Sequence, residues 1–171
     1  LDVAQLSEAS FEDVLNISNG LIIDSHSCAS GICNHERNIS DHRIMEIANR
    51  GGFVGLSFYS ALVNDEKSAP TLNDLVRHIK YIVDLVGIDH VALGPDYSSF
   101  DTLTPTQRER HPGEIEGIKY QKRESDYIKG PDKIEKLSLL TSKLVEEGYS
   151  EEEIEKILGG NSVRVYRKVL A

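Results

Sequence analysis

Few cysteines, no cluster of basic residues and no long apolar run occur in this sequence, and each absence excludes a class of protein. The two cysteines, Cys28 and Cys33, have no second Cys/His pair at zinc-finger spacing, so they favour neither a structural zinc site nor a disulfide scaffold. The formal net charge is -9, and no Lys/Arg cluster offers the basic patch that nucleic acid requires. The apolar runs are far shorter than the ~20 residues that span a bilayer. We therefore expect neither nucleic acid nor a membrane among its partners.

Short apolar runs alternate with helical patterns along the chain. The runs are residues 1–4, 20–24, 53–58 and 90–93. Such alternation is typical of parallel βαβ units, and four units are half of a closed (β/α)8 barrel, which has about 250 residues. The pattern alone leaves two folds open, half of such a barrel and a small doubly wound α/β domain. Because residues 1–4 resemble the middle of a strand, we expect the natural chain to extend further upstream.

The helical pattern over residues 72–86 is the clearest one. Its apolar residues recur at i, i+3, i+4 and i+7 spacing. Thr71 is placed to cap the first turn, and Asp74 favours the positive end of the helix. His78 lies inside this helix, so we expect a structural or solvent-facing role for it rather than a catalytic one.

Residues 97–130 form a long polar stretch that interrupts the alternation, and we interpret them as a loop insertion. Helical periods return after this stretch. Ser150 with Glu153 predicts a capping box at the start of one helix, and Asn161 is expected to cap the last helix.

Polar residues follow each of the four predicted strands, where the strand ends. They are Gln5, the run of Ser25, His26 and Ser27, then Tyr59, and finally Asp96. In parallel α/β folds the carboxyl ends of the strands meet at one edge of the sheet, and working residues gather there. A lone histidine after an apolar strand is usually structural, but polar residues at four successive strand ends indicate a functional site.

Several of these strand ends belong to longer motifs that occur in order along the chain. The motifs cover residues 2–7, 25–27, 37–38, 57–59, 87–91, 94–97, 159–161 and 164–165. In order and spacing they resemble the membrane (renal) dipeptidase family of zinc peptidases. The resemblance implies an α/β fold of the (β/α)8 TIM-type barrel, with this chain covering roughly strands five to eight. Residues 1–171 would then be the C-terminal half of a single barrel domain, with a long loop insertion at 97–130.

The resemblance also implies an activity and a role for each of four residues. The family hydrolyses dipeptides with two zinc ions and a bridging hydroxide that attacks the peptide carbonyl. His26 would be a ligand of the second zinc, since imidazole suits that metal. Arg37 would bind the terminal carboxylate of the dipeptide, Tyr59 would line the substrate pocket, and Asp96 would move protons near the metal-bound water.

Gln5 departs from the family pattern. It stands where the family has its other histidine ligand to the second zinc, and a carboxamide oxygen is a poor zinc ligand beside imidazole. We therefore expect this metal position to be weaker, differently filled or empty, so that the protein holds one zinc ion or two. The remaining ligands, in the family a His-x-Asp pair and a glutamate on earlier strands, would precede Leu1.

Three hypotheses remain open for the function. The first is a dipeptidase-like metallopeptidase whose upstream half provides the first metal. The second is an amidohydrolase-type barrel enzyme that acts on a cyclic amide or another amide substrate, for which Arg37 would matter little. The third is a dipeptidase relative that has lost a metal and only binds its ligand. Half a barrel exposes two sheet edges, so the N-terminal half of the barrel or another copy of the chain is an expected partner.

Overall fold

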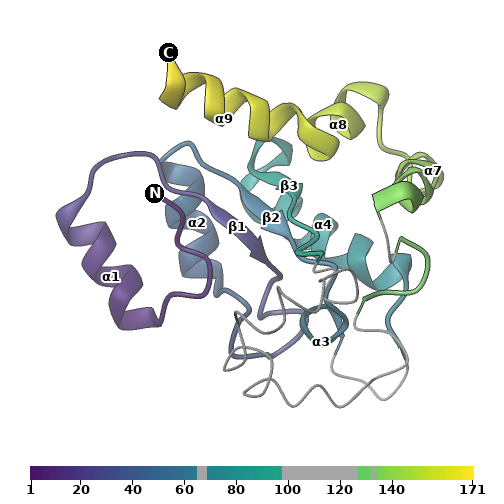
Figure 1. Cartoon of the computed structure of the whole chain (residues 1–171), viewed down its shortest axis with the longest axis horizontal. Coiled ribbons are helices and arrows are strands. Elements are labelled where there is room, and N and C mark those ends of the chain that lie inside the picture. The colour runs from purple at the N-terminus through teal and green to yellow at the C-terminus, as the bar shows by residue number, and fades with distance from the viewer. Residues whose placement is uncertain (65–68, 98–126, 132–133) are drawn as a thin grey trace, which may run out of the picture.

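A parallel β-sheet forms the centre of the computed structural model, which describes residues 1–64, 69–97, 127–131 and 134–171 (Figure 1). Its strands are β1 (Asp24–Ser27), β2 (Val54–Leu56) and β3 (Val91–Leu93), hydrogen-bonded to one another in that order. β1 pairs with β2 and β2 with β3, in both cases in parallel. The alternation in the sequence therefore predicted the parallel arrangement correctly.

The first two predicted strands differ from the observed ones. Residues 1–4 form one parallel bridge to Ile23 in place of a strand. The amide of Val3 donates to the carbonyl of Ile23 at 2.8 Å. Gln5 then has a φ of 62°, far from the extended region, which ends the pairing. β1 also starts later than the prediction at residues 20–24.

Helices cover the sheet and close both ends of its strands. The α-helices are α1 (Glu8–Ile17), α2 (Asp41–Asn49), α3 (Ser60–Val63), α4 (Leu72–Val86), α7 (Ser138–Glu146), α8 (Glu151–Glu155) and α9 (Asn161–Leu170). Short turns of other helix types are η1 (Ile88–His90), η3 (Ile134–Lys136) and η4 (Lys156–Gly160). In Figure 1, α8 and α9 lie across one end of the strands, whereas α3 lies near the other end.

Asn161 fastens α9 to the amino end of β3. Its side-chain nitrogen donates to the carbonyls of Ile88 and Val91, each at 2.8 Å, and the residue is buried. The prediction that Asn161 caps the last helix was wrong. The turn η4 runs directly into α9, so the amide of Asn161 already donates to the carbonyl of Lys156, and the side chain is left to bind β3.

α4 begins as the sequence predicted, and its histidine is fully buried. Thr71 and Asp74 form a capping box, in which the amide of Thr71 donates to the Asp74 carboxylate at 2.8 Å. The His78 ring accepts from the amide of Ala29 at 3.2 Å, and its Nε2 donates to the carbonyl of Val63 at 2.9 Å. His78 thus ties the segment after β1 to α3. A structural role is confirmed, and the solvent-facing alternative was wrong.

Two glycines allow the backbone of β1 to come very close to β2 and to the residue after β3. A Cβ atom on Gly55 would lie 2.2 Å from the carbonyl oxygen of Ser25, and one on Gly94 would lie 1.8 Å from the same oxygen. Both distances are far below van der Waals contact, so only glycine fits at these positions. The sheet is therefore sharply curved where β2 and β3 approach β1. On its outer side it packs against α2 and α4, whose buried residues include Ile44, Ile47, Leu75, Ile79 and Ile82.

Most of the predicted loop insertion at 97–130 lies outside the described residues. Its last residues are paired with the sheet end. Tyr127 forms an antiparallel bridge with Tyr59, and the amide of the buried Ile128 donates to the carbonyl of Phe58 at 3.0 Å. The chain therefore returns from this segment to the carboxyl end of β2.

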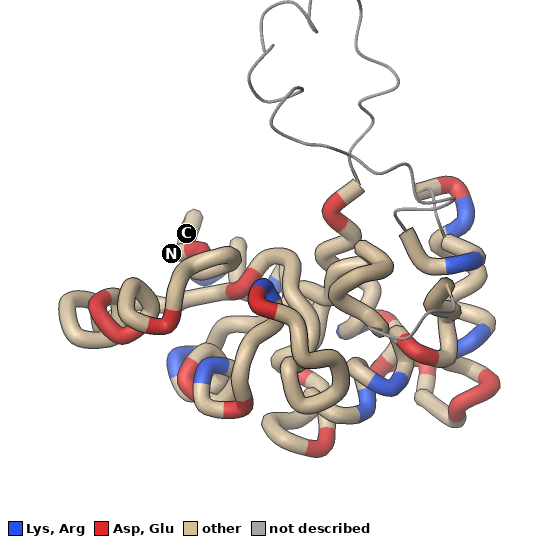
Figure 2. The backbone as a smooth tube through the Cα atoms, turned by 90° about the horizontal axis from the view of Figure 1, so that it is seen from below, with Lys and Arg blue, Asp and Glu red and all other residues tan. Residues whose placement is uncertain are grey.

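Charged residues lie mostly on the outer helices and turns, where acidic and basic residues are interspersed (Figure 2). Lys156 pairs with Asp89 at 3.1 Å and with Glu152 at 3.2 Å, and Lys143 pairs with Glu147 at 2.8 Å. Much of the charge on these helices is therefore balanced locally. Among the helices that the structure describes, none is both long and apolar enough to cross a membrane.

The burial of His78 predicts a pH-dependent stability. Burial lowers the pKa of its imidazole below the ordinary value of 6.5, so the unfolded chain takes up a proton that the folded chain does not. The free energy of unfolding should therefore fall as the pH drops through the unfolded pKa, by up to about 1.4 kcal/mol per pH unit. His78→Gln keeps a neutral polar group and should remove this part of the slope. Urea denaturation of both proteins from about pH 7.5 to 5 checks this, and equal slopes would contradict it.

Candidate functional site

Gln5 and Asp96 have left-handed backbone conformations. Their φ angles are 62° and 55°, and in the described part of the chain they are the non-glycine residues with positive φ. Such strained residues persist where the surrounding structure imposes them, and they are often found at functional sites. Gln5 follows the bridge beside β1, and Asp96 follows β3. Both strained residues therefore lie at the carboxyl ends of parallel segments.

Arg43 of α2 holds the turn that carries Gln5. Its guanidinium donates to the carbonyl of Val3 at 3.0 Å and to the carbonyl of Leu6 at 2.9 Å, on either side of Gln5. The same group lies 4.6 Å from the ring centre of Phe11, a favourable cation–π distance. A planar guanidinium with several fixed donors suits this double contact. The conformation of Gln5 is therefore imposed from the neighbouring helix.

The side chain of Gln5 binds directly to His26. Its Nε2 lies 2.7 Å from Nε2 of His26, and the other ring nitrogen, Nδ1, lies 2.7 Å from Oγ of Ser25. If the amide donates, the proton of the neutral ring sits on Nδ1 and points to Ser25, which satisfies all three groups. Both ring nitrogens of the half-buried His26 are thus engaged by the protein itself.

Two aspartates fix the backbone around His26. Oδ1 of Asp2 accepts from the amides of Ala4 and Ser25, each at 3.1 Å. Asp24 is fully buried at the start of β1 and accepts from the amide of His26 at 3.2 Å. Burial raises the pKa of Asp24. Asp2 therefore joins the first segment to β1 beside His26, and Asp24 holds the strand itself.

Asn38 shapes the loop that carries Arg37. Its side-chain nitrogen donates to the carbonyls of Cys33 and Leu62, each at 2.8 Å, and its oxygen accepts from the amide of Cys28 at 3.1 Å. One buried amide group therefore satisfies three backbone groups, from the residue after β1, from the following loop and from α3. The loop is held closed, which places Arg37 beside the end of β3.

Arg37 and Asp96 meet at the carboxyl edge of the sheet. Nη2 of Arg37 lies 3.4 Å from Oδ2 of Asp96, and the two side chains are 31% and 40% exposed. This is a long and accessible contact, which contributes little to stability. Nε of Arg37 is buried and makes no hydrogen bond in the described structure. A buried nitrogen is out of reach of solvent, so an incoming group would meet the Nη atoms of this half-exposed side chain.

Tyr59 belongs to a group of aromatic rings beside Asp96. Its ring lies edge-on to Tyr127 at 6.4 Å, and Tyr127 lies 5.1 Å from Tyr97. The hydroxyl of Tyr127 donates to the backbone carbonyl of Asp96 at 2.9 Å. Tyr127 therefore supports the strained residue Asp96 from a distant part of the sequence, as Arg43 supports Gln5.

The structure brings the predicted site residues together in two contacts, Gln5 with His26 and Arg37 with Asp96. Sequence reasoning missed the supporting residues Arg43 and Tyr127. A charged residue among the apolar positions of a helix is a weak signal that could have pointed to Arg43. No sequence pattern points to Tyr127, because it reaches Asp96 from the far end of a long segment.

The described residues do not fit a metal site of their own. Nowhere in the ranges that the structure describes do three His, Cys, Asp or Glu side chains gather closely enough to hold a metal ion. His26 has both ring nitrogens engaged, and its nearest polar neighbour at Nε2 is the amide of Gln5. A zinc site requires about three protein ligands with free lone pairs. Any such site would need ligands from other residues.

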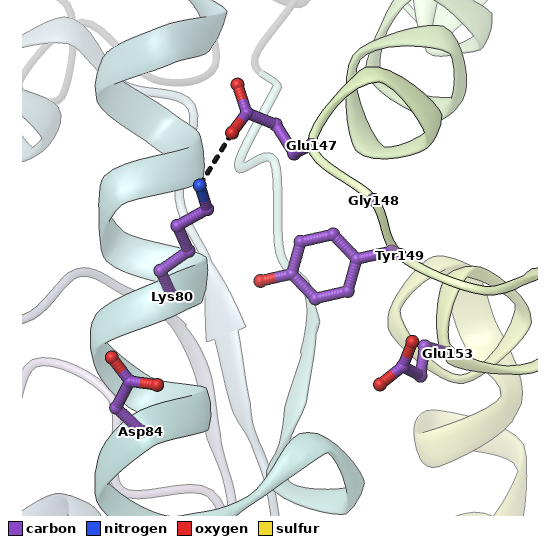
Figure 3. Close-up of a pocket in the computed structure, with 6 residues that line it drawn as sticks. All are labelled: Lys80, Asp84, Glu147, Gly148, Tyr149 and Glu153. Carbon is purple, nitrogen blue, oxygen red and sulfur yellow. Dashed lines mark hydrogen bonds and ion pairs between the residues drawn. The ribbon is translucent and has the colours of Figure 1, made fainter.

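A hollow lies between α4 and the turn from α7 to α8 (Figure 3). Its lining residues are Lys80, Asp84, Glu147, Gly148, Tyr149 and Glu153. Hydrogen bonds from Lys143 at 2.8 Å and Lys80 at 2.6 Å lower the pKa of Glu147 to about 2. Glu153 is used in the predicted capping box with Ser150. Lys80, Glu147 and Glu153 are thus already bonded within the protein, and these contacts join the helices that border the hollow.

Comparisons with known proteins, by sequence and by structure, point to the same family. A model of the family described as membrane dipeptidase (peptidase family M19) matches residues 1–107 and 117–171. The dipeptidase ataJ of Aspergillus terreus is 32% identical over 170 residues, which cover 99% of this chain and 36% of that protein. This chain thus spans little more than a third of the length of that curated relative.

Two solved structures share the fold. The dipeptidase AC, a metallopeptidase of family M19, superposes with a TM-score of 0.75 at 24% identity, over 94% of this chain and 41% of that chain. A metallopeptidase from Rhodobacter sphaeroides superposes with a TM-score of 0.74 at 24% identity, over 94% of this chain and 40% of that chain. The latter was crystallised with a phosphinate mimic of the dipeptide L-Ala-D-Ala.

The contact between Tyr127 and Asp96 gives a first test of this geometry. Tyr127→Phe removes the hydroxyl but keeps the ring contacts, so it should lower the free energy of unfolding by about 1 kcal/mol. Tyr166→Phe is the matched control, because Tyr166 is half exposed on α9, and it should leave the stability unchanged. Urea denaturation measures both. An equal effect of the two changes would contradict the role of Tyr127.

Proposed function

The chain belongs to the membrane dipeptidase family, peptidase family M19, and from this membership we propose that it serves in the hydrolysis of dipeptides. The observation that carries the proposal is the contact between Arg37 and Asp96, because it offers an accessible guanidinium at the edge where strand ends meet. Recognition of a small peptide by its terminal carboxylate is the task that such a group performs best.

We assign this chain to strands five to eight of a (β/α)8 barrel. The segment of residues 1–4 and the strands β1, β2 and β3 lie side by side in parallel, in chain order, which is the order of a barrel. The sharp curvature at Gly55 and Gly94 suits a closed sheet. In this assignment residues 1–171 form the C-terminal half of one barrel domain, and the N-terminal half covers the exposed sheet edges.

Arg37 is the proposed binding group for the substrate carboxylate. Its present partner, Asp96, touches it through one long contact of 3.4 Å. A peptide carboxylate can instead accept two parallel hydrogen bonds from the guanidinium, which is a stronger, charge-assisted arrangement. The substrate would therefore replace Asp96 at Arg37, and binding would release the Asp96 carboxylate.

Asp96 is the proposed catalytic residue, and Tyr59 the proposed wall of the substrate pocket. Once released from Arg37, the Asp96 carboxylate can accept a proton at Oδ2 and return it during turnover. Its backbone stays fixed through the bond from Tyr127, so the carboxylate moves by side-chain rotation alone. Tyr59 adds an aromatic surface on the same side, against which a small side chain of the peptide can pack.

Zinc remains part of the proposal as a property of the whole protein. The family consists of metallopeptidases, and a metal supplies a water-derived nucleophile near neutral pH. The described residues do not fit a metal site, so we assign to them the recognition of the substrate and the movement of a proton. The zinc ligands would come from the remaining strands of the barrel.

A second candidate function is ligand binding without hydrolysis. The observation that favours it is Gln5, which engages His26 at the place where the family has a metal ligand. A protein of this kind would bind a free dipeptide through Arg37 and leave its peptide bond intact. Incubation of the intact protein with zinc and a dipeptide separates the two functions, because only the first one releases free amino acids.

Replacement of Arg37 tests the proposed recognition. Arg37→Met should lower kcat/KM for a free dipeptide by about 10- to 100-fold, chiefly through KM, because one charge-assisted bidentate contact is lost. The same dipeptide with an amidated C-terminus should be hydrolysed equally by both proteins. Steady-state kinetics on the intact protein, with the two substrates side by side, gives the measurement.

Arg77→Met is the matched control for this experiment. Arg77 is exposed on α4 and pairs only loosely with Asp74, at 3.9 Å. This change should leave both substrates unaffected. Equal losses for the free and the amidated dipeptide in Arg37→Met would contradict carboxylate recognition and favour an amidohydrolase that acts on another amide.

A further inference from the structure

We infer that the protein itself fills the second metal position of its family, with the hydrogen bond between Gln5 and His26 in place of a zinc ion. The inference rests on the proposed function only in that the family relationship defines this position. It concerns the residues themselves, because the Nε2 atoms of Gln5 and His26 are 2.7 Å apart. That distance is a hydrogen-bond distance, and it is shorter than the ~3.3 Å that separates two nitrogen ligands of one tetrahedral zinc ion.

Either orientation of the Gln5 amide keeps a metal from His26. With the amide nitrogen toward the ring, Nε2 accepts a hydrogen bond, and its lone pair is used. With the amide oxygen toward the ring, Nε2 must carry a proton, and Nδ1 accepts from the hydroxyl of Ser25 at 2.7 Å. A zinc ligand needs an unprotonated ring nitrogen with a free lone pair. In both cases, therefore, metal binding requires that the protein first break a hydrogen bond.

The backbone that carries Gln5 is also held in place beside His26. The two bonds from Arg43 fix the carbonyls on either side of it, and the backbone of Gln5 has a φ of 62°. The Arg43 side chain is almost fully buried. Moving the Gln5 backbone away from His26 would disturb this buried contact. The position of Gln5 beside His26 is thus set by α2 and the first segment together, and only rotation of the exposed Gln5 side chain can open the pair.

The bonded pair changes what this part of the site offers to a substrate. A metal ion would polarise a substrate oxygen as a Lewis acid. The bonded pair offers only hydrogen bonds instead. Because both ring nitrogens of His26 are engaged, we assign only the other end of the Gln5 amide to hydrogen-bonding of the substrate.

Zinc content tests the inference on the intact protein. Gln5→His restores a second imidazole, and after zinc saturation and desalting this variant should hold about one zinc ion per protomer more than the wild type. The double variant with Gln5→His and His26→Ala should lose that gain, because the added ion needs both rings. Gln5→Asn is the matched control, since it cannot place a strong zinc ligand there, and it should match the wild type.

Two outcomes would overturn the inference. One is a loss of zinc when His26→Ala is made in the wild-type background, which would mean that His26 already holds an ion. The other is an unchanged zinc content in a folded Gln5→His variant, which would mean that this place is not a metal position at all.

The ring nitrogens of His26 give a second, independent reading. Long-range ¹H–¹⁵N spectra of the wild type should show one neutral tautomer that zinc does not alter, whereas the spectrum of Gln5→His should change on zinc addition. A change in the wild-type ring signals would also overturn the inference. Neither measurement uses a substrate, so failure of the proposed dipeptide hydrolysis would leave both readings valid.

Discussion

Parallel pairing of the strands is the constraint on which the site depends. The strands β1, β2 and β3 and the first segment all run in the same direction. The chain therefore leaves each of them at the same side of the sheet, where their carboxyl ends lie. The polar residues that end these segments are thereby collected at that side. The amino ends of the strands are covered by α9, which Asn161 anchors to the start of β3. The proposed binding residues and the Asn161 anchor thus lie at opposite ends of the strands, as expected for parallel α/β proteins.

The two strained residues of the site are each supported by a distant side chain. Gln5 depends on Arg43 from α2, and Asp96 depends on Tyr127, which returns to the sheet after a long segment. A left-handed backbone at these residue types is unfavourable by itself, so such support is what keeps the side chains aimed at His26 and Arg37. The site is therefore built by contacts between elements rather than by any single loop.

Local patterns predicted the local features well. The cap at Thr71, the capping box at Ser150 and the helix over Leu72–Val86 follow from neighbouring residues, and the structure confirms them. The predictions of where β1 begins and of what Asn161 does were wrong. Both features depend on which backbone groups already have hydrogen-bond partners in other elements. Motif order pointed to His26 and Asp96, but their bonds to Gln5 and Arg37 join residues far apart in sequence. Such contacts depend on the folded sheet, which no local pattern encodes.

Binding of a small peptide at the carboxyl ends of the strands can be followed through the backbone amide signals of the protein. A free dipeptide is added to the ¹⁵N-labelled intact protein, and the changes in amide shift are followed by residue. We expect the largest changes in amide shift at Gln5, His26, Arg37 and Asp96. Changes gathered instead around Lys80 and Tyr149, in the hollow between the helices, with the strand ends unaffected, would contradict it.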